Sequence, residues 1–148
     1  MDNISVIIRC KNEERWIGHA IQSALDYINK PEIIIVNNDS TDDSKLIISH
    51  FRQNAYLNES NRTDIKVIDV DEYTPGKALN LGVETATRDN ILILSAHSVL
   101  SGVDINEHIN SLKTYACVFG KQTPVRRGRR ITKRYIWSHF GEERAVNM

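Results

Sequence analysis

The sequence predicts an α/β fold in which a mostly parallel β-sheet carries helices on both faces. Short runs of β-branched residues recur along the chain, and most are followed by a polar segment and then by apolar residues at helical spacing. Strands that alternate with helices require crossover connections, which place neighbouring strands parallel and cover both faces of the sheet. The chain has 148 residues, of which 41% are hydrophobic, and this is enough for one compact domain with a buried core.

Five segments are predicted to form strands. A strand that is buried on both faces reads as a nearly continuous apolar run, because neither face meets water. The run ISVII near the N-terminus and the run IIIV after Glu32 both have this character. The predicted strands are residues 4–8, 32–36, 65–70, 91–94 and 116–119.

Four segments between these strands are predicted to form helices. Apolar residues recur at helical spacing from Trp16 to Ile28 and indicate the first helix. Ser40 is predicted to cap the second, because a serine followed by acidic residues suits a helix start. Pro75 and Asp104 are predicted to open the third and fourth helices. Residues 54–64 are rich in Asn, Ser and Thr and predict a surface loop.

Polar segments follow the predicted strands at their carboxyl ends, at residues 10–14, 37–43, 71–77 and 95–98. In open α/β sheets the ligand binds outside the carboxyl ends of the strands, so these segments are expected to gather at one edge. The first of them, CKNEE, lacks the glycines of a dinucleotide-binding turn. A Walker A loop is excluded as well, because Gly76-Lys77 is followed by Ala78 and not by Ser or Thr.

The composition excludes several other classes of protein. Cys10 and Cys117 lie far apart and form no CxxC pair, so neither a zinc knuckle nor a disulfide framework is predicted. No apolar run approaches the roughly 20 residues that a membrane span needs. The N-terminus lacks the basic and apolar segments of a secretory signal. We therefore expect a cytoplasmic protein, free in solution or at the inner face of the membrane.

Four sequence segments resemble the N-terminal half of family 2 glycosyltransferases, which have the GT-A fold. They are ISVIIRCKNEERWIGHAIQSAL, EIIIVNNDSTDDS, TPGKALNLGVETAT and NILILSAHSVL, and they occur in the family's order and at about its spacing. The resemblance covers residues 4 to about 120. It implies that this half binds the nucleotide of an activated sugar, with a UDP-sugar expected, and that the sugar passes to a glycan or lipid-linked acceptor in surface polysaccharide biosynthesis.

The resemblance also implies which residues form the nucleotide-sugar site. The family's acidic pair after the second strand reads Asn37-Asn38 here, which retains amide donors and acceptors but loses the charge. Lys77 at a helix start suits a diphosphate, although the alternative is a solvated lysine beside a helix cap. The residues implied to bind the nucleotide sugar are Arg9, Lys11, Asn12, Glu13, Asn37, Asn38, Asp39, Gly76, Lys77, Ser95 and Ala96.

His97 stands where the family places the second aspartate of its Asp-x-Asp metal motif, and Ser95 stands in place of the first. Three roles remain open for this histidine. It could bind a divalent metal such as Mn²⁺, since imidazole shifts the preference away from Mg²⁺. It could instead contact the diphosphate directly, or it could be only a residue of the turn.

The C-terminal residues are strongly basic. Residues 121–148 hold 8 Lys and Arg against 2 acidic residues, and six of these cations lie in RRGRRITKR, residues 126–134. This run is interpreted either as a solvated flexible loop that flanks the active site or as a peripheral membrane contact. Nucleic-acid binding is not predicted, because no RNA-binding motif accompanies the run.

The resemblance implies a fragment of a longer domain. We expect residues 1–120 to form the nucleotide-sugar-binding domain and residues 121–148 to lead toward an acceptor-binding half. Inverting members of the family use a carboxylate as base, which we expect beyond Met148, because the surroundings of Glu142-Glu143 do not match the family's motif. The leading hypothesis is the donor-binding half of an inverting glycosyltransferase, and the alternative is a non-catalytic nucleotide-sugar-binding module.

Overall fold

The computed structural model describes residues 3–57, 63–130 and 144–146. The chain divides into two compact units, Met1–Gly102 and Val103–Met148. The boundary that the sequence predicts at residue 120 concerns function and stays a prediction.

The first unit is built on a four-stranded parallel sheet. Its strand order is β3-β2-β1-β4, so the two most apolar strands lie in the centre. Ile7 of β1 lies opposite Ile34 of β2 on one side and Ile93 of β4 on the other. The strands are β1 (Ile4–Cys10), β2 (Glu32–Asn37), β3 (Asp64–Asp69) and β4 (Asn90–Ser95).

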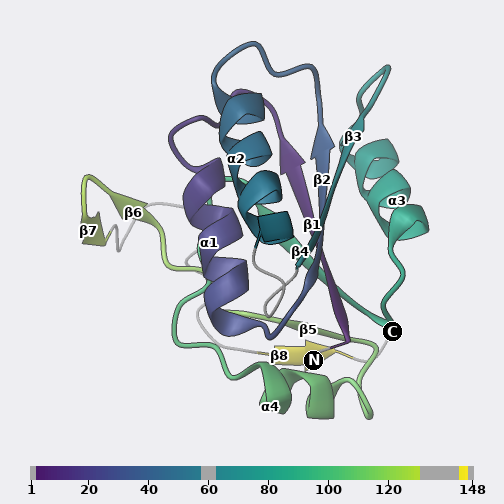
Figure 1. The fold of residues 1–148 in the computed structure, drawn as a ribbon. Helices are drawn as coiled ribbons and strands as arrows, with labels where there is room; N and C mark the ends of the chain where they lie inside the picture. Colours follow the sequence, from purple (N-terminus) through teal and green to yellow (C-terminus); the bar gives the residue numbers. More distant parts are fainter. Residues whose placement is uncertain (1–2, 58–62, 131–143, 147–148) are drawn as a thin grey trace. The chain divides into compact units, whose positions relative to one another are not determined.

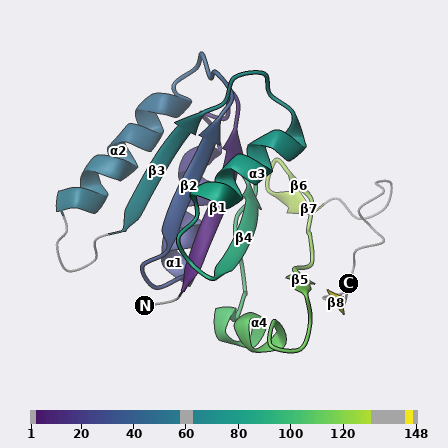
Figure 2. The same cartoon turned by 90° about the vertical axis from the view of Figure 1, so that its right-hand side faces the viewer.

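Helices cover both faces of this sheet, as the sequence predicts (Figure 1 and Figure 2). Helices α1 and α2 lie side by side on one face, and α3 lies on the other. Thr74 caps α3 by accepting a hydrogen bond from the Lys77 N–H, and Pro75 stands in its first turn. The bounds are α1 (Ile17–Tyr27), α2 (Ser44–Leu57) and α3 (Pro75–Thr85).

The core lies on both sides of the central strands. Successive residues of a strand point to opposite faces, so burial under helices on both sides makes every residue of Ile33–Val36 fully buried. On the α3 face, Ile7 packs with Ala78. Helix α3 approaches closest at Gly82, where an added Cβ would lie 2.5 Å from Ile7 Cγ2. The glycine therefore permits the close contact between helix and strand.

A buried carboxylate, Glu32, stabilises the amino end of the sheet. It accepts hydrogen bonds from Ser5 on β1, from Lys66 Nζ on β3 at 2.5 Å, and from the backbone N–H and hydroxyl of Thr87 at 2.8 and 2.9 Å. Burial by itself would raise the pKa of this carboxyl, but the hydrogen bonds outweigh it and lower the pKa to about 2. Glu32 thus joins three strands and the segment before β4 at the edge opposite the predicted site.

The second unit contains short elements only. As predicted, the Asp104 side chain caps α4 (Ile105–Ser111). Strand β5 (Cys117–Phe119) lies in the predicted segment, but it pairs antiparallel with β8 (Arg144–Val146), so it is not a fifth strand of the parallel sheet. The sequence could not show this, because a short apolar run does not specify its partner strand.

The basic run begins in a hairpin. Strands β6 (Val125–Arg126) and β7 (Arg129–Arg130) pair antiparallel around Arg127 and Gly128, which both have positive φ, at 51° and 73°. Two central residues with positive φ make the two-residue turn that matches the twist of paired strands. Residues 126–130 are therefore a hairpin and not an irregular loop, and residues 131–134 lie outside the described residues.

The second helix differs from its prediction at both ends. It begins at Ser44 and not directly after Ser40, whose hydroxyl instead accepts a hydrogen bond from the backbone of Asn12. It continues to Leu57, so the first part of the predicted loop at 54–64 is helical. Within the described parts of the chain, no helix combines the length and the apolar character that crossing a membrane requires.

Candidate functional site

The loop between β1 and α1 is held by the loop between β2 and α2. Three consecutive backbone N–H groups donate to side-chain oxygens: Asn12 to Ser40 Oγ at 3.0 Å, Glu13 to Ser44 Oγ at 2.8 Å, and Glu14 to Asp42 Oδ2 at 2.9 Å. In return, Asn12 Oδ1 accepts from the Thr41 N–H at 2.8 Å and Glu14 Oε2 accepts from the Asp43 N–H at 3.2 Å. These reciprocal bonds fix the two loops as one rigid edge.

The loop bonds also explain the local backbone and the local pKa values. Asn12 adopts a positive φ of 53°, a conformation that asparagine tolerates better than most residues. Desolvation tends to raise the pKa of the Asp42 carboxyl. Hydrogen bonds from Ser44 and Glu14 outweigh this effect and hold the pKa below its ordinary value. Burial raises the pKa of the Cys10 thiol, which belongs to the core.

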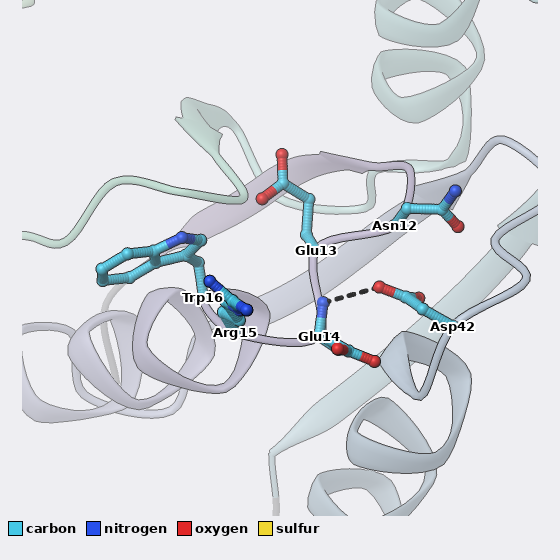
Figure 3. Close-up of a pocket in the computed structure, with 6 residues that line it drawn as sticks. All are labelled: Asn12, Glu13, Glu14, Arg15, Trp16 and Asp42. Atoms are coloured by element: carbon cyan, nitrogen blue, oxygen red, sulfur yellow. Dashed lines mark hydrogen bonds between the residues drawn. The ribbon is translucent and has the colours of Figure 1, made fainter.

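A shallow pocket of about 210 Å³ opens at this edge (Figure 3). The Glu13 carboxylate points away from Asp42, while Arg15 and Trp16 lie together at the other end of the loop. Trp16 is 52% exposed and its ring lies 6.2 Å from that of His19. The residues that line the pocket are Asn12, Glu13, Glu14, Arg15, Trp16 and Asp42.

His97 projects from the turn after β4 and contacts the β1 loop. Its Nε2 lies 3.2 Å from Ser95 Oγ, and its Nδ1 lies 3.1 Å from Glu13 Oε1. The His97 side chain is 62% exposed, whereas that of Glu13 is 23% exposed. The imidazole thus lies at the surface among the loops that follow the strands, and it does not point into the core.

Two further predicted residues, Arg9 and Lys77, contact the loop between β3 and α3. Arg9 at the end of β1 donates a hydrogen bond from Nη1 to the Tyr73 hydroxyl at 3.1 Å. Lys77 Nζ donates to the Asp71 carbonyl oxygen at 2.9 Å and lies 4.0 Å from a Glu72 carboxylate oxygen. Both cations are therefore tied to the loop between β3 and α3.

Asn37 is fully buried and both ends of its amide are engaged. Its Nδ2 donates to Asp69 Oδ1 at 2.6 Å, and its Oδ1 accepts from the Ser40 N–H at 3.3 Å. Its neighbour Asn38 is half-buried, and its backbone N–H donates to the Cys10 carbonyl oxygen at 2.8 Å. In this structure Asn37 joins strand ends, and its contact with a nucleotide stays a prediction.

The remaining predicted residues contribute less to this edge. The Asp39 side chain is 88% exposed and lies 3.9 Å from Lys45 Nζ, which is the geometry of a weak surface ion pair. Lys11 is exposed, and Ala96 is buried and can offer only backbone groups. A Cβ on Gly76 would meet nothing within 4 Å, so no steric constraint explains this glycine.

The described residues supply an incomplete set of metal ligands. Among them, no group of three or more His, Cys, Asp and Glu side chains is placed to hold a metal ion. One imidazole with a carboxylate beside it fits a divalent cation that accepts nitrogen, such as Mn²⁺, and that takes its other ligands from phosphate oxygens and water. His97 therefore fits such an ion only together with a diphosphate.

Four residues that the sequence predictions did not name as site residues hold this edge together: Ser40, Asp42, Ser44 and Tyr73. The signal for the first three was the segment DSTDDS, because short polar side chains of this kind bind nearby backbone groups. No local signal pointed to Tyr73, whose partner Arg9 lies 64 residues away in the sequence.

Comparisons with known proteins agree with this fold. The model for the family described as glycosyl transferase family 2 matches residues 5–147. The poly-beta-1,6-N-acetyl-D-glucosamine synthase of Staphylococcus epidermidis is 33% identical over 104 residues, which are 68% of this chain and 23% of that protein. The chain therefore spans about a quarter of the length of this relative.

Solved structures show the same architecture at lower identity. The crystal structure of S. aureus TarS 1-349 has a TM-score of 0.65 and 20% identity, covering 88% of this chain and 38% of that one, and TarS 1-349 is also known in complex with UDP. The mannosyltransferase PcManGT from Pyrobaculum calidifontis, in complex with GDP-Man and Mn²⁺, has a TM-score of 0.59 and 19% identity, covering 75% of this chain and 31% of that one. The sheet order, the helices on both faces and the match over residues 5–147 together show that the chain belongs to glycosyl transferase family 2.

Proposed function

We propose that the chain is the donor-binding part of a glycosyltransferase and that it binds a nucleoside diphosphate sugar at the carboxyl edge of its sheet. The observation that carries the proposal is the arrangement of loops after four parallel strands, which are tied to one another and present Glu13, Ser95 and His97 together. UDP is the expected nucleotide, because the structurally similar TarS 1-349 has been crystallised with it. Membership of a transferase family favours an enzyme over a purely binding module.

The donor diphosphate is proposed to lie beside His97. If a divalent cation is bound there, His97 would be its protein ligand, and the ion would supply Lewis-acid stabilisation of the leaving diphosphate. Arg9 in β1 and Lys77 in α3 supply positive charge at this edge. They would bind the nucleotide after exchanging their present partners, which are Tyr73, Asp71 and Glu72.

The proposal also covers the acceptor of the sugar and the stereochemistry of the transfer. We place the enzyme in the synthesis of a surface polysaccharide, as for the S. epidermidis synthase that it resembles. The transfer is proposed to invert the anomeric centre, with a carboxylate base supplied from outside residues 1–148. Such a base must lie within hydrogen-bond reach of the acceptor hydroxyl.

A membrane contact is proposed for the basic hairpin. Arg129 and Arg130 are exposed at its end, and each basic side chain near an anionic bilayer contributes about 1 kcal/mol of attraction. Replacing both with glutamate should abolish sedimentation of the protein with phosphatidylserine vesicles. Equal sedimentation of the variant and the native protein would remove this part of the proposal.

Calorimetry with UDP tests the donor site. The native protein is expected to bind UDP more tightly with Mn²⁺ than with a chelator, and His97→Ala should weaken binding in Mn²⁺ by at least about tenfold, or about 1.4 kcal/mol. His50→Ala serves as the matched control, because His50 is an exposed histidine on α2. UDP affinities within twofold for His97→Ala and the native protein, in both buffers, would contradict the role of His97.

A further inference from the structure

The backbone of Glu13 is held at both its N–H and its carbonyl oxygen, although the residue belongs to a surface loop. Its backbone N–H donates to Ser44 Oγ at 2.8 Å. Its carbonyl oxygen accepts from the N–H groups of Trp16 and Ile17 at 2.9 and 2.8 Å, at the start of α1. The residue is thus fixed between the starts of two helices, and its side chain is only 23% exposed.

The carboxylate of Glu13 faces one particular atom of His97. Glu13 Oε1 lies 3.1 Å from Nδ1, whereas the other ring nitrogen, Nε2, faces the hydroxyl of Ser95 at 3.2 Å. An ionised carboxylate can only accept hydrogen bonds, so the Glu13 contact requires a proton on Nδ1. In the neutral imidazole the lone pair then lies on Nε2, where it accepts from the Ser95 hydroxyl.

We propose that Glu13 is a positioning residue for His97. It selects the tautomer that carries its proton on Nδ1 and holds the ring so that Nε2 presents its lone pair at the donor site. A hydroxyl rotates freely, so Ser95 can turn its proton away and release Nε2 to a cation on the donor diphosphate. A carboxylate that orients a metal-binding histidine in this way typically changes metal affinity by about 10- to 100-fold.

The proposed role of Glu13 rests on the donor site proposed at His97, but experiments can test the role of Glu13 and the donor site separately. A simple surface ion pair between Glu13 and His97 would contribute little and would not select a tautomer. The tautomer is a property of the protein without any ligand. It can therefore be measured even if UDP does not bind.

Nitrogen-15 NMR of the histidine rings in alkaline buffer, where an imidazole is neutral, reads the tautomer directly. In the native protein we expect the proton of His97 on Nδ1. Glu13→Ala should shift it toward Nε2, whereas Glu13→Gln, which keeps an acceptor oxygen, should retain it on Nδ1. The matched control is Glu84→Ala, because Glu84 is an exposed glutamate on α3 that the site does not use.

Binding of Mn²⁺ in the presence of UDP provides the second measurement. Glu13→Ala should weaken Mn²⁺ binding at least about tenfold, Glu13→Gln should weaken it less, and Glu84→Ala should leave it within twofold. A thermal unfolding curve for each variant shows that it is folded. The proposal is overturned if Glu13→Ala keeps the native tautomer, or if the tautomer changes and Mn²⁺ binding stays within twofold. If the native protein binds no UDP while Glu13→Ala still shifts the tautomer, the donor site is wrong and the positioning of His97 stands.

Discussion

The side-chain amide of Asn37 donates a hydrogen bond to Asp69 Oδ1 at 2.6 Å and so joins the carboxyl ends of β2 and β3. The resemblance to the family implies an acidic residue at the position of Asn37. A second carboxylate at this buried position would face that of Asp69 with no proton between them. The structure therefore gives a physical reason for the amide, because Asp69 on the neighbouring strand requires a donor.

Asn37→Asp should destabilise the protein at neutral pH. The new carboxylate would be buried beside Asp69, and such pairs cost about 1–3 kcal/mol. Urea unfolding at neutral pH measures the loss. The double variant Asn37→Asp/Asp69→Asn restores one donor and one acceptor and should recover most of it; a double variant that is less stable than Asn37→Asp alone would show that the pair is not the cause.

Gly82→Ala should destabilise the packing of α3 on the sheet. The added methyl group would lie 2.5 Å from Ile7 Cγ2 and 3.4 Å from Val36 Cγ2, inside a fully buried core. Overpacking of this kind costs about 1–3 kcal/mol, which urea unfolding resolves. Gly76→Ala in the same helix is the control, because its methyl group meets nothing within 4 Å, and it should be neutral or stabilising by up to about 1 kcal/mol. Equal stability of the two variants would contradict the packing.

Glu32 should make stability depend on acid pH. Its pKa is lowered from 4.5 to about 2 in the folded protein, so its contribution is fully present above pH 4.5 and is lost as pH falls toward about 2. A shift of this size corresponds to roughly 3 kcal/mol. Urea unfolding of the native protein and Glu32→Gln from neutral to acid pH should show a difference of this order that shrinks through this window. A difference that stays constant with pH would contradict the account.

Much of the fold was predictable because local pattern and packing agree. Strands β1 and β2 lie where continuous apolar runs predict them, since central strands under two layers of helix must be apolar throughout. The edge strands β3 and β4 also lie where the sequence predicts strands, but they are only partly buried. Pro75 and Asp104 mark helix starts for reasons that act within one turn. Ser40 does not cap a helix as its local sequence predicts, because its hydroxyl accepts a hydrogen bond from the backbone N–H of Asn12 in the β1 loop.

The gathering of the loops that follow the strands was predictable, but the contacts between them were not. The position of His97 after β4 follows from the sequence, whereas its contact with Glu13 joins residues 84 positions apart. The same holds for Asn37, whose burial depends on Asp69 across the sheet. Glu32 was visible only as an acid at the start of an apolar strand, and its partners come from β1, β3 and the segment before β4.

Amide NMR of the labelled protein during titration with UDP and Mn²⁺ tests the central claim most directly, because it locates the ligand on the sheet. We expect the largest shift changes with UDP, and the strongest signal broadening by paramagnetic Mn²⁺, at the carboxyl edge, at Asn12, Glu13, Lys77 and His97, and little change around Glu32 at the opposite edge. Changes centred on Glu32 and Thr87, or no changes at saturating UDP, would contradict a donor site at the carboxyl edge.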